Sequence, residues 1–424
     1  MKLRIVFLVK TFPSVSETFI LNQVIQLLDV GHDVQVFATH RPDKSHVQHK
    51  LVGEYDLLSR TTYRPHMPED RLARIAKAVK ILAENPAKAP VLLKTLNVAR
   101  FGELALSLDL FYTAVPFLDA KEFDIIHGHF GMNGVKAAAI KSLGLLRGKL
   151  VTTFYGYDVN SKYISAKSKS YYNQLISMGD GFSAGSGFLH KKALKFGFPE
   201  EKIARIPMGI DTQKFTPDFK DKETRDNNLV RFVSVGRLVE MKGFEYSIRA
   251  FERVVHQQGY KNVHYTIIGE GTNRPRLEDL INKLNLTGYI TLAGAKTQEE
   301  VKAAFQLADV FVLPSVNSSD GTVETQGLVI QEAEAMMLPV LISDVGGVAD
   351  GLIDGETGFL FPEKDVDALA EKMVYMINNP AEAKKMGAAG RKFVVENYDI
   401  KVMGKKMEDL YFRVLNNQLK KSLK

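Results

Sequence analysis

Two glutamates in the last third of the chain have the spacing and surroundings of a ligand-binding loop. Glu324 and Glu332 lie in ETQGLVIQEAEAMM, where a helix is expected to begin after Gly327. Ligands of open α/β sheets bind at the carboxyl ends of strands, beside helix N-termini. The amides of Gly327, Leu328 and Val329 would suit phosphate or hydroxyl oxygens. The carboxylates could accept hydrogen bonds from a sugar and a ribose; alternatively, one complements the helix dipole and the other is a surface residue.

Two cations follow an earlier predicted strand, in the segment SVGRLVEMKGFEYSIRAF. Gly236 permits a tight turn at the strand end, and Arg237 and Lys242 flank the start of the next helix. Positive charges at the carboxyl end of a strand can neutralise a departing diphosphate as its charge develops. Pairs of surface cations are common, so this segment indicates a ligand site only in combination with Glu324 and Glu332.

Two further segments in this half carry glycines or capping residues. Gly269 and Gly271 follow a predicted strand in TIIGEGTNRPRLEDL, but Arg274 stands where a dinucleotide fingerprint has its third glycine. Thr297 and Glu300 fit a helix capping box, which is a structural role.

The N-terminal half offers weaker candidates. Glu17 and Ser14 fit a capping box, and the alternative for Glu17 is contact with an acceptor or donor, because its loop follows the first strand. Gly131 allows close backbone approach at another strand end. His127 and His129 precede it; His129 is expected to face a cleft, although either ring could be a hydrogen-bonded structural histidine.

Short apolar runs alternate with helical patterns along the chain, which is typical of a parallel α/β fold. The expected strands are 3–9, 33–38, 124–127, 150–154, 181–184, 230–235, 264–268, 289–293, 310–313 and 340–343. The 424 residues exceed what one core usually organises. We therefore predict two doubly wound, Rossmann-like domains, residues 1–206 and 230–400, joined by a polar linker at 207–229. A helix at about 401–424 is expected to cross back to the first domain.

Composition limits the partners and the location. The net charge of +7 suggests an anionic partner, and no run of about 18 apolar residues occurs, so we expect a cytoplasmic protein. Residues 71–100 place Leu72, Ile75, Val79 and Leu82 at helical spacing among bases. Such a helix could lie on the inner face of an anionic membrane, or it could simply have a solvated basic face. Nucleic acid is disfavoured, because few aromatic residues interleave the bases.

Taken in order, these segments resemble the retaining glycosyltransferases of family 4, which have the two-lobed GT-B fold, over nearly the whole chain. The strongest part is the pairing of GRLVEMKG with ETQGLVIQEAEAMMLPVLISDVGG, whose glutamates match the family's pair. KTFPSVSETFILNQV and HGHFGMNG resemble the exopolysaccharide and colanic-acid branch.

The resemblance implies roles for these residues in a nucleotide-sugar site. Arg237 and Lys242 would hold the donor diphosphate. Glu324 would contact the donor sugar and Glu332 the ribose, while Gly327–Val329 would offer amides. Ala295 and Lys296 would border the base. The implied reaction retains the anomeric configuration and uses neither metal nor cofactor, with a glycan or lipid-linked acceptor. The one Asp-x-Asp match, Asp365–Asp367, fits a helix start.

One departure from the family concerns Tyr155 in TTFYGYD, where the family usually has a histidine thought to contact the donor sugar. Tyrosine keeps a hydroxyl but cannot carry positive charge. Asp158 could share that role, or cap the following helix. Two alternatives therefore stay open: a sugar-nucleotide 2-epimerase of the same fold, and a non-catalytic sugar-nucleotide-binding partner.

Overall fold

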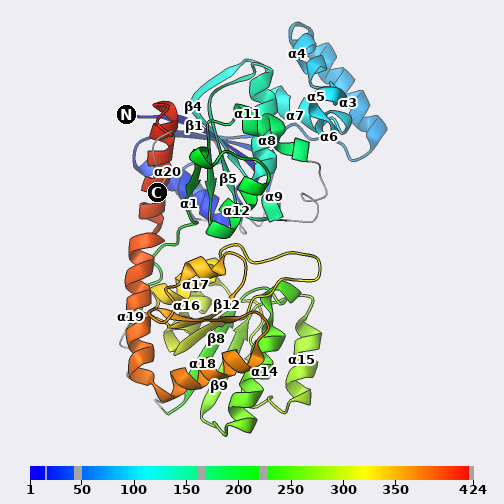
Figure 1. The fold of residues 1–424 in the computed structure, drawn as a ribbon. Helices are drawn as coiled ribbons and strands as arrows, with labels where there is room; N and C mark the ends of the chain where they lie inside the picture. Colours follow the sequence, from blue (N-terminus) through cyan, green and yellow to red (C-terminus); the bar gives the residue numbers. More distant parts are fainter. Residues whose placement is uncertain (15–16, 43–49, 161–168, 219–227, 420–424) are drawn as a thin grey trace.

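The computed structural model describes residues 1–14, 17–42, 50–160, 169–218 and 228–419, and contains two parallel sheets in separate lobes (Figure 1). The first sheet has the order β3-β2-β1-β4-β5-β6-β7 and the second β10-β9-β8-β11-β12-β13. The first comprises β1 (Arg4–Thr11), β2 (Asp33–His40), β3 (Thr61–Tyr63), β4 (Lys121–His129), β5 (Leu146–Phe154), β6 (Gly181–Ala184) and β7 (Ile203–Arg205). The second comprises β8 (Val230–Val235), β9 (Val263–Ile268), β10 (Ile290–Leu292), β11 (Val310–Leu313), β12 (Val340–Asp344) and β13 (Gly358–Pro362).

Helices lie on both faces of each sheet, which confirms the predicted two-domain, Rossmann-like GT-B class. The N-terminal lobe holds α1 (Thr18–Asp29), α2 (Lys50–Glu54), α3 (Arg71–Glu84), α4 (Ala89–Lys94), α5 (Val98–Phe101), α6 (Glu103–Leu106), α7 (Asp109–Ala114), α8 (Gly131–Ser142), α9 (Tyr157–Asn160), α11 (Asn173–Met178) and α12 (Gly187–Lys195). The C-terminal part holds α14 (Phe244–Glu252), α15 (Arg274–Lys283), α16 (Gln298–Leu307), α17 (Leu328–Ala335), α18 (Val366–Asn378), α19 (Pro380–Asn397) and α20 (Ile400–Leu415).

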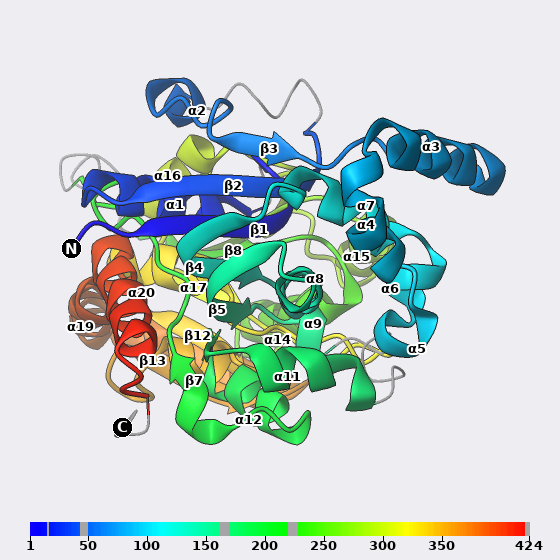
Figure 2. The same ribbon diagram turned by 90° about the horizontal axis from the view of Figure 1, so that it is seen from above.

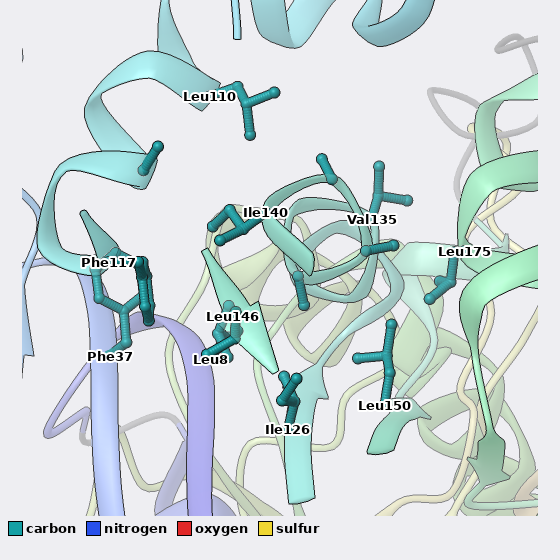
Figure 3. Packing of buried hydrophobic residues seen from close by; sticks show 14 of the residues in the cluster. Leu8, Phe37, Leu110, Phe117, Ile126, Val135, Ile140, Leu146, Leu150 and Leu175 are labelled. Carbon is teal, nitrogen blue, oxygen red and sulfur yellow. The ribbon is translucent and has the colours of Figure 1, made fainter. Parts of the chain in front are cut away.

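All ten expected strands are present, and β3, β7 and β13 were missed. Each missed strand lies at the edge of its sheet. Two of them, β3 (TTY) and β7 (IAR), are too short to show an apolar run, whereas β13 (GFLFP) is apolar but begins with glycine and ends with proline, which are typical of loops. The N-terminal core explains why the central ones were visible. Helix α8 covers β4 and β5, and its Val135 and Ile140 belong to one buried cluster with Ile126 and Leu150 of those strands (Figure 3).

The last two helices run along one side of both lobes (Figure 1). Helix α19 packs against α17 of the C-terminal lobe, and α20 packs against α1 of the N-terminal lobe. Met403, Met407 and Tyr411 are buried in one cluster with residues of β1 and β2, so α20 completes the core of the first lobe. The Tyr411 hydroxyl also lies 2.6 Å from Nδ1 of His127 on β4.

Helices α3 to α6 project from the opposite side of the N-terminal lobe (Figures 1 and 2). Ala78 and Ile81 of α3 are buried, whereas Leu72, Ile75 and Val79 are exposed. The apolar residues of α3 are therefore divided between an inner face and an outward stripe. Among the described residues, no helix is both long and apolar enough to cross a membrane.

Two of the expected caps lie at helix starts that the structure describes. The Thr297–Glu300 capping box is present, and Asp365 caps α18 by accepting a hydrogen bond from the amide of Ala368, so both structural assignments are confirmed. The expected capping box of Ser14 and Glu17 includes residues 15–16, which lie outside the described residues, so it stays a prediction. Helix α1 itself begins after Glu17, whose side chain makes no capping bond at that helix start.

Candidate functional site

The loop after β8 is shaped by a close approach to the loop after β11. Gly243 has a φ of +62°, and a Cβ there would lie 2.0 Å from the carbonyl oxygen of Pro314. The amide of Val316 donates to the carbonyl of Met241 at 2.8 Å. Glycine at 243 thus lets the two loops join, which brings Lys242 beside the segment that carries Glu324.

Lys242 and Glu324 form an ion pair between these loops. Their side chains are only 10% and 15% exposed, so water screens the pair weakly. Arg237, in contrast, is exposed beside the end of β8. A cation and a carboxylate that neutralise each other can separate when an anionic diphosphate and a sugar hydroxyl bind. The structure therefore brings together two of the three residues expected at the reacting end of the donor.

Gly236, Gly269 and Gly271 serve the packing of the loops after β8 and β9. A Cβ at Gly269, where φ is +145°, would meet the carbonyl oxygen of Gly236 at 1.9 Å. One at Gly271 would lie 2.4 Å from the carbonyl oxygen of Leu238. Positions 269 and 271 are too crowded by backbone for side chains, whereas a Cβ at Gly236 would lie 3.1 Å from the side chain of Lys242.

Helix α17 begins beside the pair and supplies the expected amides. Gly327 precedes it with a φ of +73°, and the amides of Leu328 and Val329 lie in the first turn, where no intrahelical acceptor exists. Glu332 lies in the second turn and is half-buried. Burial raises the pKa of Glu332 to about 7, opposed by a hydrogen bond from Gln298 and by the charge of Lys214.

Ala295 and Lys296 follow β10, next to the glycine loop of β9. The amide of Gly269 donates to the carbonyl of Gly294 at 2.8 Å. The Lys296 ammonium lies 3.0 Å from Glu300 on α16, so its charge is directed to the capping box. At this position a nucleotide base would lie against the backbone of residues 294–296 and not against the charge of Lys296.

On the facing lobe, Tyr155 directs its hydroxyl inward. Its ring lies 4.6 Å from that of Phe19 and 4.8 Å from that of Phe130, and its hydroxyl is 2.8 Å from Nδ1 of His129. His129 is fully buried, so the expectation that it faces the cleft is wrong. Burial, followed by the neighbouring His127, holds the pKa of His129 well below its usual value. Both rings belong to the lobe interior.

Gly131 and Asp158 form a second buried arrangement. The Asp158 carboxylate accepts hydrogen bonds from the amides of Gly131, Tyr155 and Gly156 at 2.8, 3.2 and 2.8 Å. It is fully buried, which raises its pKa, and the three amides oppose the rise. A Cβ at Gly131 would lie 2.6 Å from the hydroxyl of Tyr172. The geometry favours the structural alternative for Asp158.

The two lobes touch through residues that the sequence did not single out. Thr325 Oγ1 donates to the carbonyl of Tyr155 at 2.8 Å. The side-chain amide of Gln326 binds both the amide and the carbonyl of Met208, each at 2.8 Å. Asp350 accepts from the amide of Gly187 at 2.6 Å. Thr325 and Gln326 adjoin Glu324, and this adjacency is the signal that could have identified them.

The comparisons with known proteins agree with this two-lobed arrangement. The model of "Glycosyltransferase Family 4" matches residues 16–214, and that of "Glycosyl transferases group 1" matches residues 215–393. The amylovoran biosynthesis glycosyltransferase AmsK of Erwinia amylovora is 32% identical over 97% of this chain and 100% of its own. The protein of Salmonella typhimurium assigned to colanic acid biosynthesis as the glycosyltransferase WcaL is 34% identical over 88% and 90%.

The chain belongs to glycosyltransferase family 4. Solved structures share the fold of this glycosyltransferase. Anabaena HepE in complex with UDP superposes with a TM-score of 0.70 at 16% identity, covering 96% of this chain and 99% of that one. Sucrose-phosphate synthase from Thermosynechococcus elongatus gives 0.67 at 19% identity, covering 98% and 100%.

Proposed function

We propose that this glycosyltransferase moves a sugar from a nucleotide diphosphate sugar to a glycan or lipid-linked acceptor in exopolysaccharide synthesis. The pathway is supported by the names of AmsK and WcaL, which are at least 32% identical over most of the chain. The donor class is supported by one observation above all. The Lys242–Glu324 pair lies at the carboxyl edge of the second sheet, beside the free amides of α17.

The chemistry that fits these residues proceeds with retention and without metal. The bond from the anomeric carbon to the phosphate oxygen breaks while Arg237 and Lys242 neutralise the charge that develops on the diphosphate. The acceptor hydroxyl forms the new bond on the same face, and its proton passes to the leaving phosphate oxygen. Glu324 binds a hydroxyl of the transferred sugar, and Glu332 binds the ribose.

A donor screen tests this proposal without knowledge of the acceptor. Thermal shifts should identify one base among uridine, guanosine and adenosine sugar diphosphates. Glu332→Ala should abolish that shift, and Arg237→Ala should lower turnover more than affinity. Unchanged donor binding in both variants would refute the site. The anomeric configuration of the product, read by NMR, decides between retention and inversion.

We also propose that the projecting helices rest on an anionic membrane surface. The outward stripe of Leu72, Ile75 and Val79 is 77%, 45% and 59% exposed and adjoins basic residues, which is the composition of an interfacial helix. Arg74 does not serve this purpose, because its guanidinium donates to the carbonyls of Pro68, Glu69 and Ser107.

Co-sedimentation with anionic vesicles tests the membrane contact. Leu72→Ser with Val79→Ser should reduce the bound fraction, and neutralising Lys77 should reduce it further at low salt. Val395→Ser, which changes an exposed valine on α19, is the matched control. Unchanged binding of the double variant would contradict the proposal.

A further inference from the structure

The segment that leaves the first lobe passes beside the start of α16 and presents a lysine to it. The Lys214 ammonium lies 2.8 Å from Oε1 of Gln298 and 2.9 Å from Oε1 of Glu299, the first two residues of α16. The Asp211 carboxylate accepts hydrogen bonds from the amides of Gln213 and Lys214 at 3.0 and 2.9 Å, so a local turn fixes the backbone of the lysine. A cation of the linker therefore reaches the donor lobe.

The chain on both sides of Lys214 is anchored to the donor lobe. Phe215 is 1% exposed and belongs to one buried cluster with residues of α16 and α17. Arg391 of α19 donates to the carbonyls of Thr212 and Phe215 at 3.2 and 2.6 Å. These anchors keep the ammonium within reach of α16, although the Lys214 side chain is 36% exposed.

Gln298 connects this lysine to the carboxylate of Glu332. The Gln298 Nε2 lies 3.5 Å from Oε1 of Glu332 on α17, while the Gln298 Oε1 accepts from Lys214. An ammonium group only donates hydrogen bonds, so the oxygen of the Gln298 amide must face Lys214 and its NH2 group must face Glu332. The lysine therefore decides which end of the amide the carboxylate meets. With the amide turned round, the Glu332 carboxylate would meet another oxygen, and two acceptors repel each other.

The helices that carry these side chains belong to one packed core. Helix α16 begins at the Thr297–Glu300 capping box, and Phe305 of α16 is buried in one cluster with Ile330 of α17. Gln298 and Glu332 therefore contact each other from rigid elements. Within the described residues, Oε2 of Glu332 receives no hydrogen bond, and each carboxylate oxygen can accept two. Acceptor positions for both hydroxyls of a ribose therefore remain.

The charges around Glu332 act together with this geometry. Burial raises the pKa of Glu332 to about 7, and the hydrogen bond from Gln298 and then the charge of Lys214 oppose the rise. Lys296 and Glu300 on α16 pair with each other at 3.0 Å. The interactions that favour an ionised Glu332 are therefore those of the contacts that run from Lys214 through Gln298.

We propose that Lys214 and Gln298 are positioning residues that direct the Glu332 carboxylate toward the ribose of the donor. This inference rests on the proposed transferase function and extends the donor site to the linker between the lobes. An oriented, ionised carboxylate binds the ribose hydroxyls through charge-assisted hydrogen bonds, which are stronger than neutral ones. The contact of Lys214 with Glu299, whose side chain is 71% exposed, would by itself be a surface ion pair of little consequence.

Calorimetric titration of the full chain at a series of pH values tests this role. The probes are UDP-glucose, GDP-mannose and ADP-glucose, whose sugar-bound diphosphates keep a constant charge near neutral pH. The affinity of the wild type for the probe that binds should rise as the pH increases through about 7, because Glu332 ionises there. Lys214→Met and Gln298→Leu each remove an interaction that lowers this pKa. The midpoint of the rise should therefore move up by about 0.5 pH unit, which is a loss of affinity of about threefold on the acidic side.

Lys302→Met is the matched control, because it removes the same charge from the same helix. The hydrogen bond and charge of Lys214 lower the pKa of Glu299, and the charge of Lys302 adds to this effect. Within the described residues, Lys302 makes no hydrogen bond to Gln298 or Glu332. The control should leave the midpoint of donor binding unchanged, and Lys214→Arg, which keeps a cationic donor, should restore most of the wild-type affinity. Equal midpoints of Lys214→Met and Lys302→Met would refute the role of Lys214.

A 2′-deoxy analogue of the probe gives a readout that a purely structural role would not change. The analogue lacks one of the two hydroxyls that Glu332 would bind. Lys214→Met should therefore weaken its binding by less than about twofold on the acidic side, against about threefold for the ordinary probe. Equal losses for the two ligands would show that Lys214 does not act through the ribose.

A carbon-13 NMR titration of Glu332 separates this inference from the proposed function, because it needs no donor. The side-chain resonance of Glu332, assigned by its absence from Glu332→Gln, should titrate at a higher pH in Lys214→Met than in Lys302→Met. Probe binding with equal NMR midpoints would defeat the role of Lys214 alone. Different NMR midpoints without binding of any of the three probes would defeat the transferase proposal and the ribose as ligand, while the effect of Lys214 on Glu332 would stand.

Discussion

Removal of Glu324 should tighten the binding of a nucleoside diphosphate while slowing sugar transfer. Lys242 is paired with Glu324, and both side chains are largely buried. A diphosphate must therefore compete with the carboxylate for the ammonium group. Glu324→Gln removes that competitor, whereas Lys242→Met removes the cation and leaves a partly buried carboxylate unpaired, which is strongly unfavourable.

The size of the effect follows from the burial of the pair. At an effective dielectric constant of about 20, two unit charges ~4 Å apart attract by about 4 kcal/mol before desolvation is subtracted. We expect the double-mutant cycle of unfolding free energies to give a coupling of about 2 kcal/mol. If the diphosphate recovers most of that coupling, Glu324→Gln should bind it about tenfold more tightly. The intact sugar donor should gain less, because the variant loses a carboxylate that binds its hydroxyl.

Chemical denaturation and calorimetric titration measure these quantities. The control cycle uses Lys214 and Glu299, an ion pair of 2.9 Å whose side chains are 36% and 71% exposed. Its coupling should stay below about 0.5 kcal/mol, as for other exposed pairs. A coupling as small for Lys242 and Glu324, or weaker diphosphate binding by Glu324→Gln, would refute the reasoning.

Three further changes have outcomes set by the structure. The pKa of Glu332 rises from 4.5 to about 7 on folding, so the folded state binds more protons than the unfolded state between these pH values. The free energy of unfolding of the wild type, measured relative to Glu332→Gln by denaturation at each pH, should therefore fall by about 1–2 kcal/mol as the pH rises from 4.5 to 7. Gly243→Ala should lower the free energy of unfolding by about 3 kcal/mol or more, because the added Cβ would meet a carbonyl oxygen. The control Gly355→Ala also has a positive φ but open space around it, so it should lower that free energy by only about 1–2 kcal/mol. Equal losses of Tm in the two variants would contradict this. Tyr411→Phe should cost about 1–3 kcal/mol by leaving a buried nitrogen of His127 without its partner, and an unchanged Tm would show that the bond contributes little.

The sequence predicted the parts of the fold whose residues are fully buried. Strand β11 (VFVL) is a continuous apolar run, because helices cover both faces of the parallel sheet. The edge strands β3 and β7 were missed because three residues are too few to show such a run. The capping box at Thr297 was predicted correctly, because its four residues are adjacent in the chain. The expected box of Ser14 and Glu17 includes residues outside the described ones and stays a prediction.

Some features of the candidate site could likewise be predicted from the sequence, and others could not. The contact between Lys242 and Glu324 could be anticipated, because strand ends of a parallel sheet share one edge. The orientations of Tyr155 and His129 could not. They depend on aromatic packing among α1, β4 and β5, which brings together residues far apart in the chain.

The chain passes between the lobes twice, near Ile210 and near Asp399, and these two connections are hydrogen-bonded to each other. Ile210 and Asp399 form a parallel bridge, and the amide of Ile400 donates to the carbonyl of Ile210 at 2.9 Å. Arg391 adds bonds to the carbonyls of Thr212 and Phe215. A chimera that exchanges donor lobes between two relatives must therefore keep α20 with the acceptor-side parent and match both crossings at once. A single junction after residue 206 would instead transplant a foreign helix into the first core.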